Sequence, residues 1–222
     1  MIHAKKDMKL SYLLSRLLLV AIFVGAVDQA GAQSAESVFE RLKEKYDAIE
    51  SLRAEFSQTM TSSYMDDEAT SNGVLVIQGD RYRVETDGQT LVTDGKVTWV
   101  YMRSQNQVLI NDHVSDEQTF SINEFLFEYD ENFNASDVET ATLNGQRHFV
   151  LTLTPKKDDA FFTEATLSMR ERDDLITQLR VVDVNGTTML FNLENIQLNP
   201  TLQDNIFSFT PPQGTEVVDL RS

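Results

Sequence analysis

Residues 72–112, NGVLVIQGDRYRVETDGQTLVTDGKVTWVYMRSQNQVLIND, decide the fold. Short β-rich runs alternate there with turns, and the runs are Val74–Ile77, Arg81–Glu85, Thr90–Thr93, Val97–Tyr101 and Val108–Ile110. The turns are Gly79-Asp80, Asp87-Gly88 and Asp94-Gly95. Asp-Gly between β-branched runs indicates a hairpin, because both residues tolerate the positive φ of the favoured turns. Such short connections cannot hold a crossover helix, so this stretch is predicted to be an antiparallel meander.

A second series of strands follows the meander. The predicted strands are residues 137–143, 148–155, 164–170, 176–184 and 187–198, and a tail that ends in Val217-Val218-Asp219 follows them. Asn144-Gly145 and Asn185-Gly186 supply hairpin turns between members of the series. With the strand that precedes the meander, the total is about ten or eleven strands, spaced as in a sandwich or barrel.

Two segments have helical character. In residues 34–50 the apolar side chains recur with the period of one helix face, namely Val38, Phe39, Leu42, Tyr46 and Ile49. In residues 52–60 the apolar side chains alternate with polar ones, so the helix feeds directly into a strand. Residues 121–127 are a short apolar patch with capping-box spacing between Ser121 and Glu124. Both helices are expected on the concave side of a single antiparallel, strongly curved sheet.

The first 32 residues are expected to be a signal peptide. Three lysines precede the apolar run Leu17–Val27, which is too short to span a bilayer comfortably. Ala30-Gly31-Ala32 fits the small-x-small cleavage rule, which predicts cleavage after Ala32 and one mature domain over residues 33–222. An uncleaved anchor is the alternative. Export of a chain without cysteine suggests a bacterial periplasm, and such a chain is not itself a lipoprotein.

Charge and cysteine content exclude several classes of function. The chain has 19 basic and 35 acidic residues, a net charge of −16. This charge disfavours nucleic acids and anionic membrane surfaces as partners, because both require basic protein surfaces. The absence of cysteine removes disulfides, thiolate nucleophiles and Cys-based metal sites.

No catalytic motif is present in the sequence. It lacks G-x-S-x-G, HExxH, P-loop and GxGxxG patterns. The two histidines of the predicted mature chain, His113 and His148, are expected to have surface or hydrogen-bonding roles. The acidic clusters lack the ligand spacing of a calcium loop. We therefore expect no enzyme activity, no cofactor and no metal.

In several predicted strands the odd-numbered and the even-numbered positions are both apolar, so both faces of the strand are apolar. Examples are Val74-Leu75-Val76-Ile77, Trp99-Val100-Tyr101-Met102 and Val108-Leu109-Ile110. A half-solvated sheet should instead show one polar face. The excess apolar surface is compatible with a large closed core or with a lipid-sized cavity, and composition alone does not decide between them.

An ordered set of short motifs resembles the periplasmic outer-membrane lipoprotein carrier family, LolA. The motifs are Leu52-x-Ala54-x-Phe56-x-Gln58, Gly73-x-Leu75, Arg81-Tyr82-Arg83, Asp94-Gly95-Lys96-x-x-Trp99-x-Tyr101, Gln107-Val108, Leu151-Thr152-Leu153-x-Pro155 and Phe207-x-Phe209-x-Pro211-Pro212-x-Gly214. Each motif is weak alone, but together they cover nearly all of residues 36–219 in order.

The resemblance implies an unclosed antiparallel β-barrel with a helical lid over a hydrophobic cavity. It implies acylated lipoproteins as cargo, an inner-membrane ABC lipoprotein-release complex as donor, an outer-membrane acceptor and a monomeric carrier. The cavity is then expected to be lined by Leu42, Tyr46, Ile49, Phe56, Tyr82, Val84, Trp99 and Tyr101. The lid is expected to comprise Ile122, Phe125 and Leu126.

This chain departs from the family pattern at two points. Val84 stands where aromatic residues often line the cavity, and Gln78-Gly79 occupies the region of the arginine that ties barrel to lid in many members. Related folds also occur in periplasmic stress sensors and mycobacterial lipid carriers. The alternatives are therefore a lipid- or lipoprotein-sensing half-barrel, which usually carries a further domain, and a β-sandwich interaction module with a filled core.

Overall fold

One long sheet dominates the computed structural model, which describes residues 34–62, 68–113, 126–127, 132–157, 160 and 162–221. Helix α1 (Ala35–Asp47) and the 3-10 turn η1 (Arg103–Gln105) accompany the sheet. The first six strands are β1 (Leu52–Thr61), β2 (Ala69–Gln78), β3 (Arg81–Thr86), β4 (Gln89–Thr93), β5 (Val97–Met102) and β6 (Gln107–Asp112). The others are β7 (Phe133–Leu143), β8 (Gln146–Pro155), β9 (Phe162–Arg170), β10 (Leu175–Asp183), β11 (Thr188–Leu198) and β12 (Glu216–Asp219).

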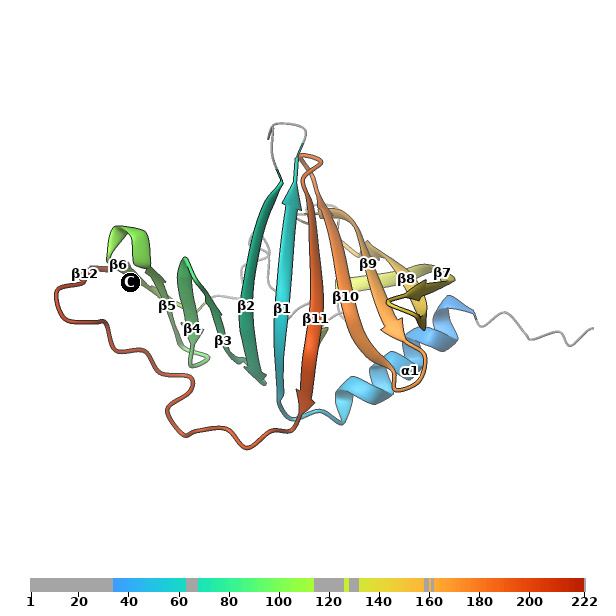
Figure 1. The fold of residues 1–222 in the computed structure, drawn as a ribbon, viewed down its shortest axis with the longest axis horizontal. Coiled ribbons are helices and arrows are strands. Elements are labelled where there is room, and N and C mark those ends of the chain that lie inside the picture. Colours follow the sequence, from blue (N-terminus) through green and yellow to red (C-terminus); the bar gives the residue numbers. More distant parts are fainter. Residues whose placement is uncertain are drawn as a thin grey trace, which may run out of the picture. The chain divides into compact units, whose positions relative to one another are not determined.

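The strands form a single sheet in the order β12-β6-β5-β4-β3-β2-β1-β11-β10-β9-β8-β7 (Figure 1). The prediction of a mainly β fold with one open antiparallel sheet is confirmed. Consecutive strands from β1 to β6 and from β7 to β11 are neighbours, as short hairpin connections require. The two series meet where β1 pairs with β11.

The expectation of an entirely antiparallel sheet is wrong at one edge. Strand β12 pairs in parallel with β6, and Val218 lies opposite Leu109. Hairpin turns force antiparallel pairing, but β12 is joined to β11 by the long segment 199–215. That connection passes the six strands β1 to β6, which separate β11 from β12 in the sheet, so it imposes no strand direction. Figure 1 shows its course from β11 to β12.

Helix α1 begins and ends near the positions that the sequence predicts. The Oγ of Ser34 accepts a hydrogen bond of 3.2 Å from the backbone N–H of Ser37, which caps the first turn. The helix ends at Asp47, three residues before the predicted limit. The Asn199 side chain then accepts the backbone N–H groups of Glu50 and Ser51, which fixes the turn into β1.

The two faces of the sheet have different cover. We call inner the face that carries Leu52, Ala54 and Phe56 of β1, and outer the face that carries Arg53 and Glu55. The helix lies on the inner face, because its buried residues belong to one core with the inner-face residues of β1 and β7–β11. The core residues on β8 and β9 include Phe149, Leu151, Leu153, Leu167 and Met169.

Register shifts are confined to the part of the sheet nearest α1. They occur between β1 and β11, between β9 and β10, and between β7 and β8. The pairs from β1 to β6 keep one register without a shift. Because a bulge bends and twists its strand, the β7–β11 side can curve around the helix while the β2–β6 side remains regular.

The segment 199–215, which we call the tail, covers part of the outer face. Val76, Val92 and Val108 are buried on that face, and Phe207 of the tail is buried too. These four residues lie outside the main core cluster. The strands that are apolar at both parities are therefore explained in part by a second, smaller core between the sheet and the tail.

Candidate functional site

An apolar row crosses the inner face from β2 to β12. The register places Leu75 opposite Val84, then Val84 opposite Leu91, and the series continues across the next strands. The complete apolar row is Leu75, Val84, Leu91, Val100, Leu109 and Val218. Directly paired residues point to the same face of a sheet, so these six side chains form one continuous stripe perpendicular to the strands.

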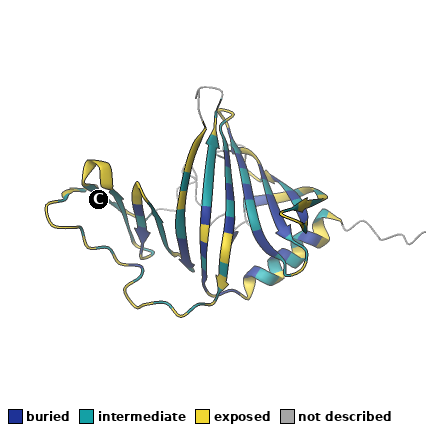
Figure 2. Ribbon diagram, viewed as in Figure 1, coloured by how far each residue is buried: buried dark blue, intermediate teal, exposed yellow. Residues whose placement is uncertain are grey.

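The apolar row differs in burial from the inner face beside α1. On β8 and β9, Leu151, Leu153 and Leu167 are completely buried. In the apolar row only Leu75 is completely buried, and Val84, Leu91, Val100 and Leu109 are each half-buried. Figure 2 shows the buried residues gathered on the strands beside α1. One half of the inner face is thus a filled core, and the other half retains accessible apolar surface.

More polar rows flank the apolar row on both sides. Toward the ends of the strands near the β2–β3 turn lie Tyr82, Thr93, Thr98 and Asn111. Toward the opposite ends lie Gly73, Thr86, Gln89, Met102 and Gln107. An apolar molecule on this face would therefore lie across the strands, along the row, with polar groups above and below it.

The sequence-predicted residues of the first helix do not line this accessible surface. Leu42 is completely buried, and Tyr46 and Ile49 are 3% and 9% exposed within the core. Phe56 belongs to the same core, with its ring centroid 6.4 Å from that of Phe191. These four residues form the filled end of the inner face.

Tyr82 and Val84, also expected to line the cavity, both lie on β3. Both are half-buried on the inner face and pack against the core. Val84 belongs to the apolar row, and Tyr82 stands in the adjacent row with its ring centroid 6.1 Å from that of His113. The structure therefore brings these two residues to the accessible half of the face.

The placement of Trp99 and Tyr101 in the same cavity is wrong. Trp99 is paired with Val92 and Ile110, which alternate with the apolar row and therefore point to the outer face. Tyr101 shares that face, and its ring centroid lies 5.7 Å from that of Phe209 in the tail. Because β5 is apolar at both parities, strand periodicity could not tell which set of side chains faces inward.

Two of the three predicted lid residues, Ile122 and Phe125, lie outside the described residues. Leu126 is described and is completely buried within the main core. The neighbouring Phe127 packs edge-on against Tyr46, with ring centroids 5.7 Å apart. Leu126 thus contributes to the core that α1 completes.

The sequence reasoning missed Leu91, Val100 and Leu109, which form the middle of the apolar row. A signal for them was present in the hairpin turns. Short Asp-Gly turns set the register of neighbouring strands. Once Val84 is placed on the inner face, that register places Leu91 and then Val100 on the same face.

The turn between β4 and β5 is held by Asp94. One oxygen of its carboxylate accepts the backbone N–H groups of Lys96 and Val97, each at 2.8 Å. Partial burial raises the pKa of Asp94, but these hydrogen bonds outweigh that effect and hold it below its usual value. The bonds favour the ionised carboxylate and keep Leu91 and Val100 in register.

Helix α1 is anchored to the start of β10 by a buried hydrogen bond and to the preceding turn by a partly buried ion pair. The Tyr46 hydroxyl oxygen accepts the backbone N–H of Ile176 at 3.0 Å, and Arg41 forms an ion pair with Asp174. The Arg41 guanidinium also lies 5.3 Å from the centroid of the Phe149 ring. Burial raises the pKa of the Tyr46 hydroxyl, so this group stays neutral in its site.

Replacing Tyr46 with phenylalanine should destabilise the fold by about 1–3 kcal/mol, because the buried N–H of Ile176 would lose its acceptor. A thermal melt should show a fall in Tm of about 2–12 °C. Tyr101→Phe is the matched control, since its hydroxyl makes an exposed 3.3 Å hydrogen bond to Asn106. Equal changes in Tm for the two variants would contradict the anchoring role.

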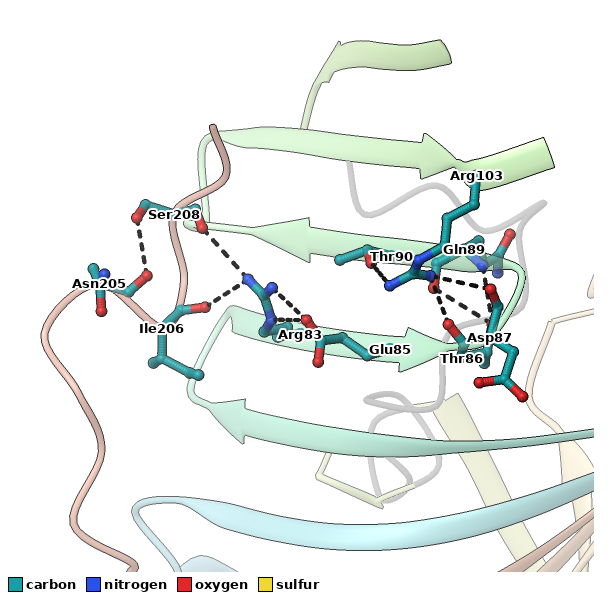
Figure 3. A network of polar contacts seen from close by, with 10 residues as sticks. All are labelled: Arg83, Glu85, Thr86, Asp87, Gln89, Thr90, Arg103, Asn205, Ile206 and Ser208. Atoms are coloured by element: carbon teal, nitrogen blue, oxygen red, sulfur yellow. Dashed lines mark hydrogen bonds and ion pairs between the residues drawn. The ribbon is translucent and has the colours of Figure 1, made fainter. Parts of the chain in front are cut away.

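The tail is fastened to the outer face by Arg83. Its Nη1 donates to the backbone oxygens of Ile206 and Ser208, at 3.3 Å and 3.4 Å, while Glu85 pairs with the same guanidinium (Figure 3). Arg81 adds a contact 4.9 Å from the centroid of the Phe207 ring. Two arginines of β3 therefore hold the tail from its sheet side.

Replacing Arg83 with alanine should loosen the tail without unfolding the sheet. The two lost hydrogen bonds contribute about 1–2 kcal/mol together. Backbone amide exchange in residues 204–210 should accordingly accelerate by about 5–30-fold. Arg180→Ala, which removes an ion pair with Glu164 far from the tail, should leave that exchange unchanged. Unaltered exchange in Arg83→Ala would show that other contacts hold the tail.

Both described histidines have hydrogen-bonded positions. His148 is buried, with Nε2 2.9 Å from Thr177 Oγ1 and Nδ1 2.9 Å from the Gln146 carbonyl oxygen. The Nδ1 of His113 lies 3.2 Å from Thr98 Oγ1. Among the described residues, no group of three or more His, Cys, Asp or Glu side chains gathers as a metal site would require.

None of the described helices has both the length and the apolar character of a membrane-spanning segment.

Comparison with known proteins gives a consistent family assignment. The model of the family described as outer membrane lipoprotein carrier protein LolA matches residues 47–210. An outer-membrane lipoprotein carrier protein of Azotobacter vinelandii is 27% identical over 92% of this chain and 98% of its own. An uncharacterized protein of Methanocaldococcus jannaschii is 24% identical over 93% of this chain, which spans 59% of that longer relative.

The fold itself recurs in a solved structure. An uncharacterized conserved protein of Thermus thermophilus superposes with a TM-score of 0.54 at 13% identity. The match covers 83% of this chain and 98% of the other. At that identity the likeness concerns the fold alone.

Proposed function

The chain belongs to the outer-membrane lipoprotein carrier family LolA, and from this premise we propose that it carries lipoproteins across the periplasm with their acyl chains on the apolar row. Members of this family are binding and transport proteins for lipoprotein cargo. The proposed role of this chain is accordingly binding and hand-over, with no chemical step.

The observation that carries the proposal is the half-buried apolar row. Its half-buried part, from Val84 to Val218, crosses five neighbouring strands from β3 to β12, a span of about 19 Å at the usual strand spacing. That span suits a long acyl chain lying across the strands. Transfer of each methylene from water onto such a surface contributes up to about 0.8 kcal/mol when burial is complete.

Partial cover of the acyl chain would permit release. Full burial of two or three chains would exceed the roughly 18–21 kcal/mol at which affinities saturate. A chain lying on the row contacts the sheet on one side, so the sheet alone supplies only part of that free energy. The sequence holds no ATP-binding motif, so loading depends on energy from a donor, and hand-over runs downhill to an acceptor.

The route of transport follows from the predicted export signal. We infer that residues 1–32 are removed after Ala32 and that the mature protein carries a net charge of −18. The donor would be an inner-membrane ABC lipoprotein-release complex and the acceptor an outer-membrane protein. In this chain the contacts of Arg41 and Tyr46 hold α1, in the absence of the family arginine near Gln78.

A binding assay with protein purified from the periplasm tests this function. A fluorescent diacylglyceryl-cysteinyl peptide should bind at micromolar concentration, and native mass spectrometry should detect co-purifying lipid or lipopeptide. Loaded protein should then transfer the peptide to acceptor membranes. Failure to bind any amphiphile at micromolar concentration would favour an interaction module with a filled core.

A further inference from the structure

A second feature of the inner face is a pocket of about 520 Å³ beside the apolar row, where η1 and the β3–β4 turn meet. We call it the rim pocket. It is lined by Gln58, Thr70, Ser71, Asn72, Thr86, Asp87, Gly88, Gln89, Met102, Ser104 and Gln105. The register connects it directly to the apolar row, because Thr86, Gln89 and Met102 each stand two residues from a row member on the same strand.

Three of these side chains extend the surface of the row. Residues two apart on a strand point to the same face and lie about 7 Å apart. Val84 precedes Thr86, Leu91 follows Gln89, and Val100 precedes Met102 by that spacing. A molecule whose apolar part lies on the row can therefore place its attached polar group in the rim pocket.

The rim pocket is lined almost entirely by uncharged polar groups. Asp87 is its only charged residue, although 24% of the whole chain is charged. Within the described part of the chain, the side-chain amides of Gln89 and Gln105 make no hydrogen bond, and both residues are exposed. Their N–H groups can therefore donate to a ligand at no cost in protein contacts.

The neighbouring pocket of about 660 Å³ shares Asn72, Thr86 and Asp87 with the rim pocket but has a different character. Its lining includes Glu55, Glu85, Asp87 and Glu194 together with the guanidinium of Arg103. The Arg103 side chain is directed to Thr90 Oγ1 and the Thr86 carbonyl oxygen, at 3.0 Å and 2.6 Å. Arg103 is not among the residues that line the rim pocket, and its guanidinium is already bound by the carbonyl oxygens of Thr86 and Asp87. A phosphate in the rim pocket would therefore have no lining cation as its partner.

We propose that the rim pocket binds the uncharged ester and amide groups of a diacylglyceryl-cysteine head, while the acyl chains lie on the apolar row. This assignment rests on the proposed carrier function. Ester and amide carbonyls are acceptors, and the free amides of Gln89 and Gln105 are donors. The exposed rim leaves the cargo polypeptide in solvent, and Asp87 repels the phosphate of anionic phospholipids.

The proposal predicts selectivity for the head group. Wild-type protein should bind a diacylglyceryl-cysteinyl peptide about tenfold or more tightly than phosphatidylglycerol with the same acyl chains. Equal affinity for the two probes would overturn the assignment, because an uncharged pocket beside a carboxylate should disfavour the phosphate.

The decisive variant is the double substitution Gln89→Glu and Gln105→Glu, measured with two probes. Both residues are exposed, and glutamate preserves the side-chain shape but removes the donors. Binding of the diacylglyceryl-cysteinyl peptide should weaken about tenfold, while binding of a fatty alcohol of the same chain length should change less than about twofold. Gln197→Glu, exposed on β11 outside the rim pocket, is the matched control and should alter neither.

Each other outcome has a distinct meaning. Equal weakening of both probes, or no weakening of either, would overturn the head-group assignment and leave the carrier function standing. If the wild-type protein binds neither the lipopeptide nor the fatty alcohol, the proposed function fails, and the head-group assignment fails with it.

Discussion

Replacing Leu91 with aspartate is expected to abolish acyl-chain binding while the sheet remains folded. Leu91 stands in the middle of the apolar row, between Val84 and Val100. A carboxylate there would lose its water when an acyl chain covers it, with no counter-ion on the row. Affinity for a diacylglyceryl-cysteinyl peptide should fall by on the order of 100-fold or more.

The matched control is Leu190→Asp. Leu190 is half-buried as well, but it lies on the outer face of β11, opposite Thr59 and Arg180. Each variant removes part of the roughly 1.5–3 kcal/mol that a buried leucine contributes, so both should melt somewhat below the wild type. Only Leu91→Asp should lose the ligand. Comparable ligand loss in the two variants would mean that the row is not the binding surface.

Replacing Gly73 with alanine is expected to destabilise the protein strongly. A Cβ at this position would lie 2.7 Å from Cζ of Phe56 and even closer to the carbonyl oxygen of Glu85. The ring belongs to the core, and the carbonyl belongs to the adjacent strand β3. Neither can move freely, so β2 and β3 would have to separate locally, at a cost of about 2–3 kcal/mol.

The expected fall in Tm for Gly73→Ala is about 4–12 °C. Gly88→Ala is the control, because a Cβ there meets no atom within 4 Å. A second variant, Gly73→Ala with Phe56→Leu, should recover part of the loss by removing the ring contact. A melt of Gly73→Ala that coincides with that of Gly88→Ala would show that the strands yield easily at this point.

Local sequence signals predicted most of the strand order. Asp-Gly and Asn-Gly turns specify antiparallel neighbours and set the register, because each short loop allows few backbone paths. The stripe Val38, Leu42 and Tyr46 likewise identified α1 and its buried side. Gly73 and Phe56, both within the family-like motifs, lie opposite each other in the pairing of β1 with β2, so that a side chain at position 73 would meet the Phe56 ring.

The candidate site was predicted only in part. Tyr82 and Val84 lie on the accessible inner face, whereas Leu42, Tyr46, Ile49 and Phe56 fill the core and Trp99 points outward. The identity of an apolar residue on a strand does not indicate whether a helix, a tail or a ligand will cover it. That outcome depends on which distant segment packs against each face.

The sequence by itself determined the β-rich meander, the amphipathic α1 and the motifs of a lipoprotein carrier, because hairpins, helix periodicity and short motifs are local properties of the chain. Only the tertiary structure decided which parity of β5 faces inward, where the tail lies and how β12 joins β6 in parallel. These features depend on contacts between segments far apart in sequence. A strand that is apolar on both sides, or a long connection, leaves such contacts unspecified until the whole chain packs.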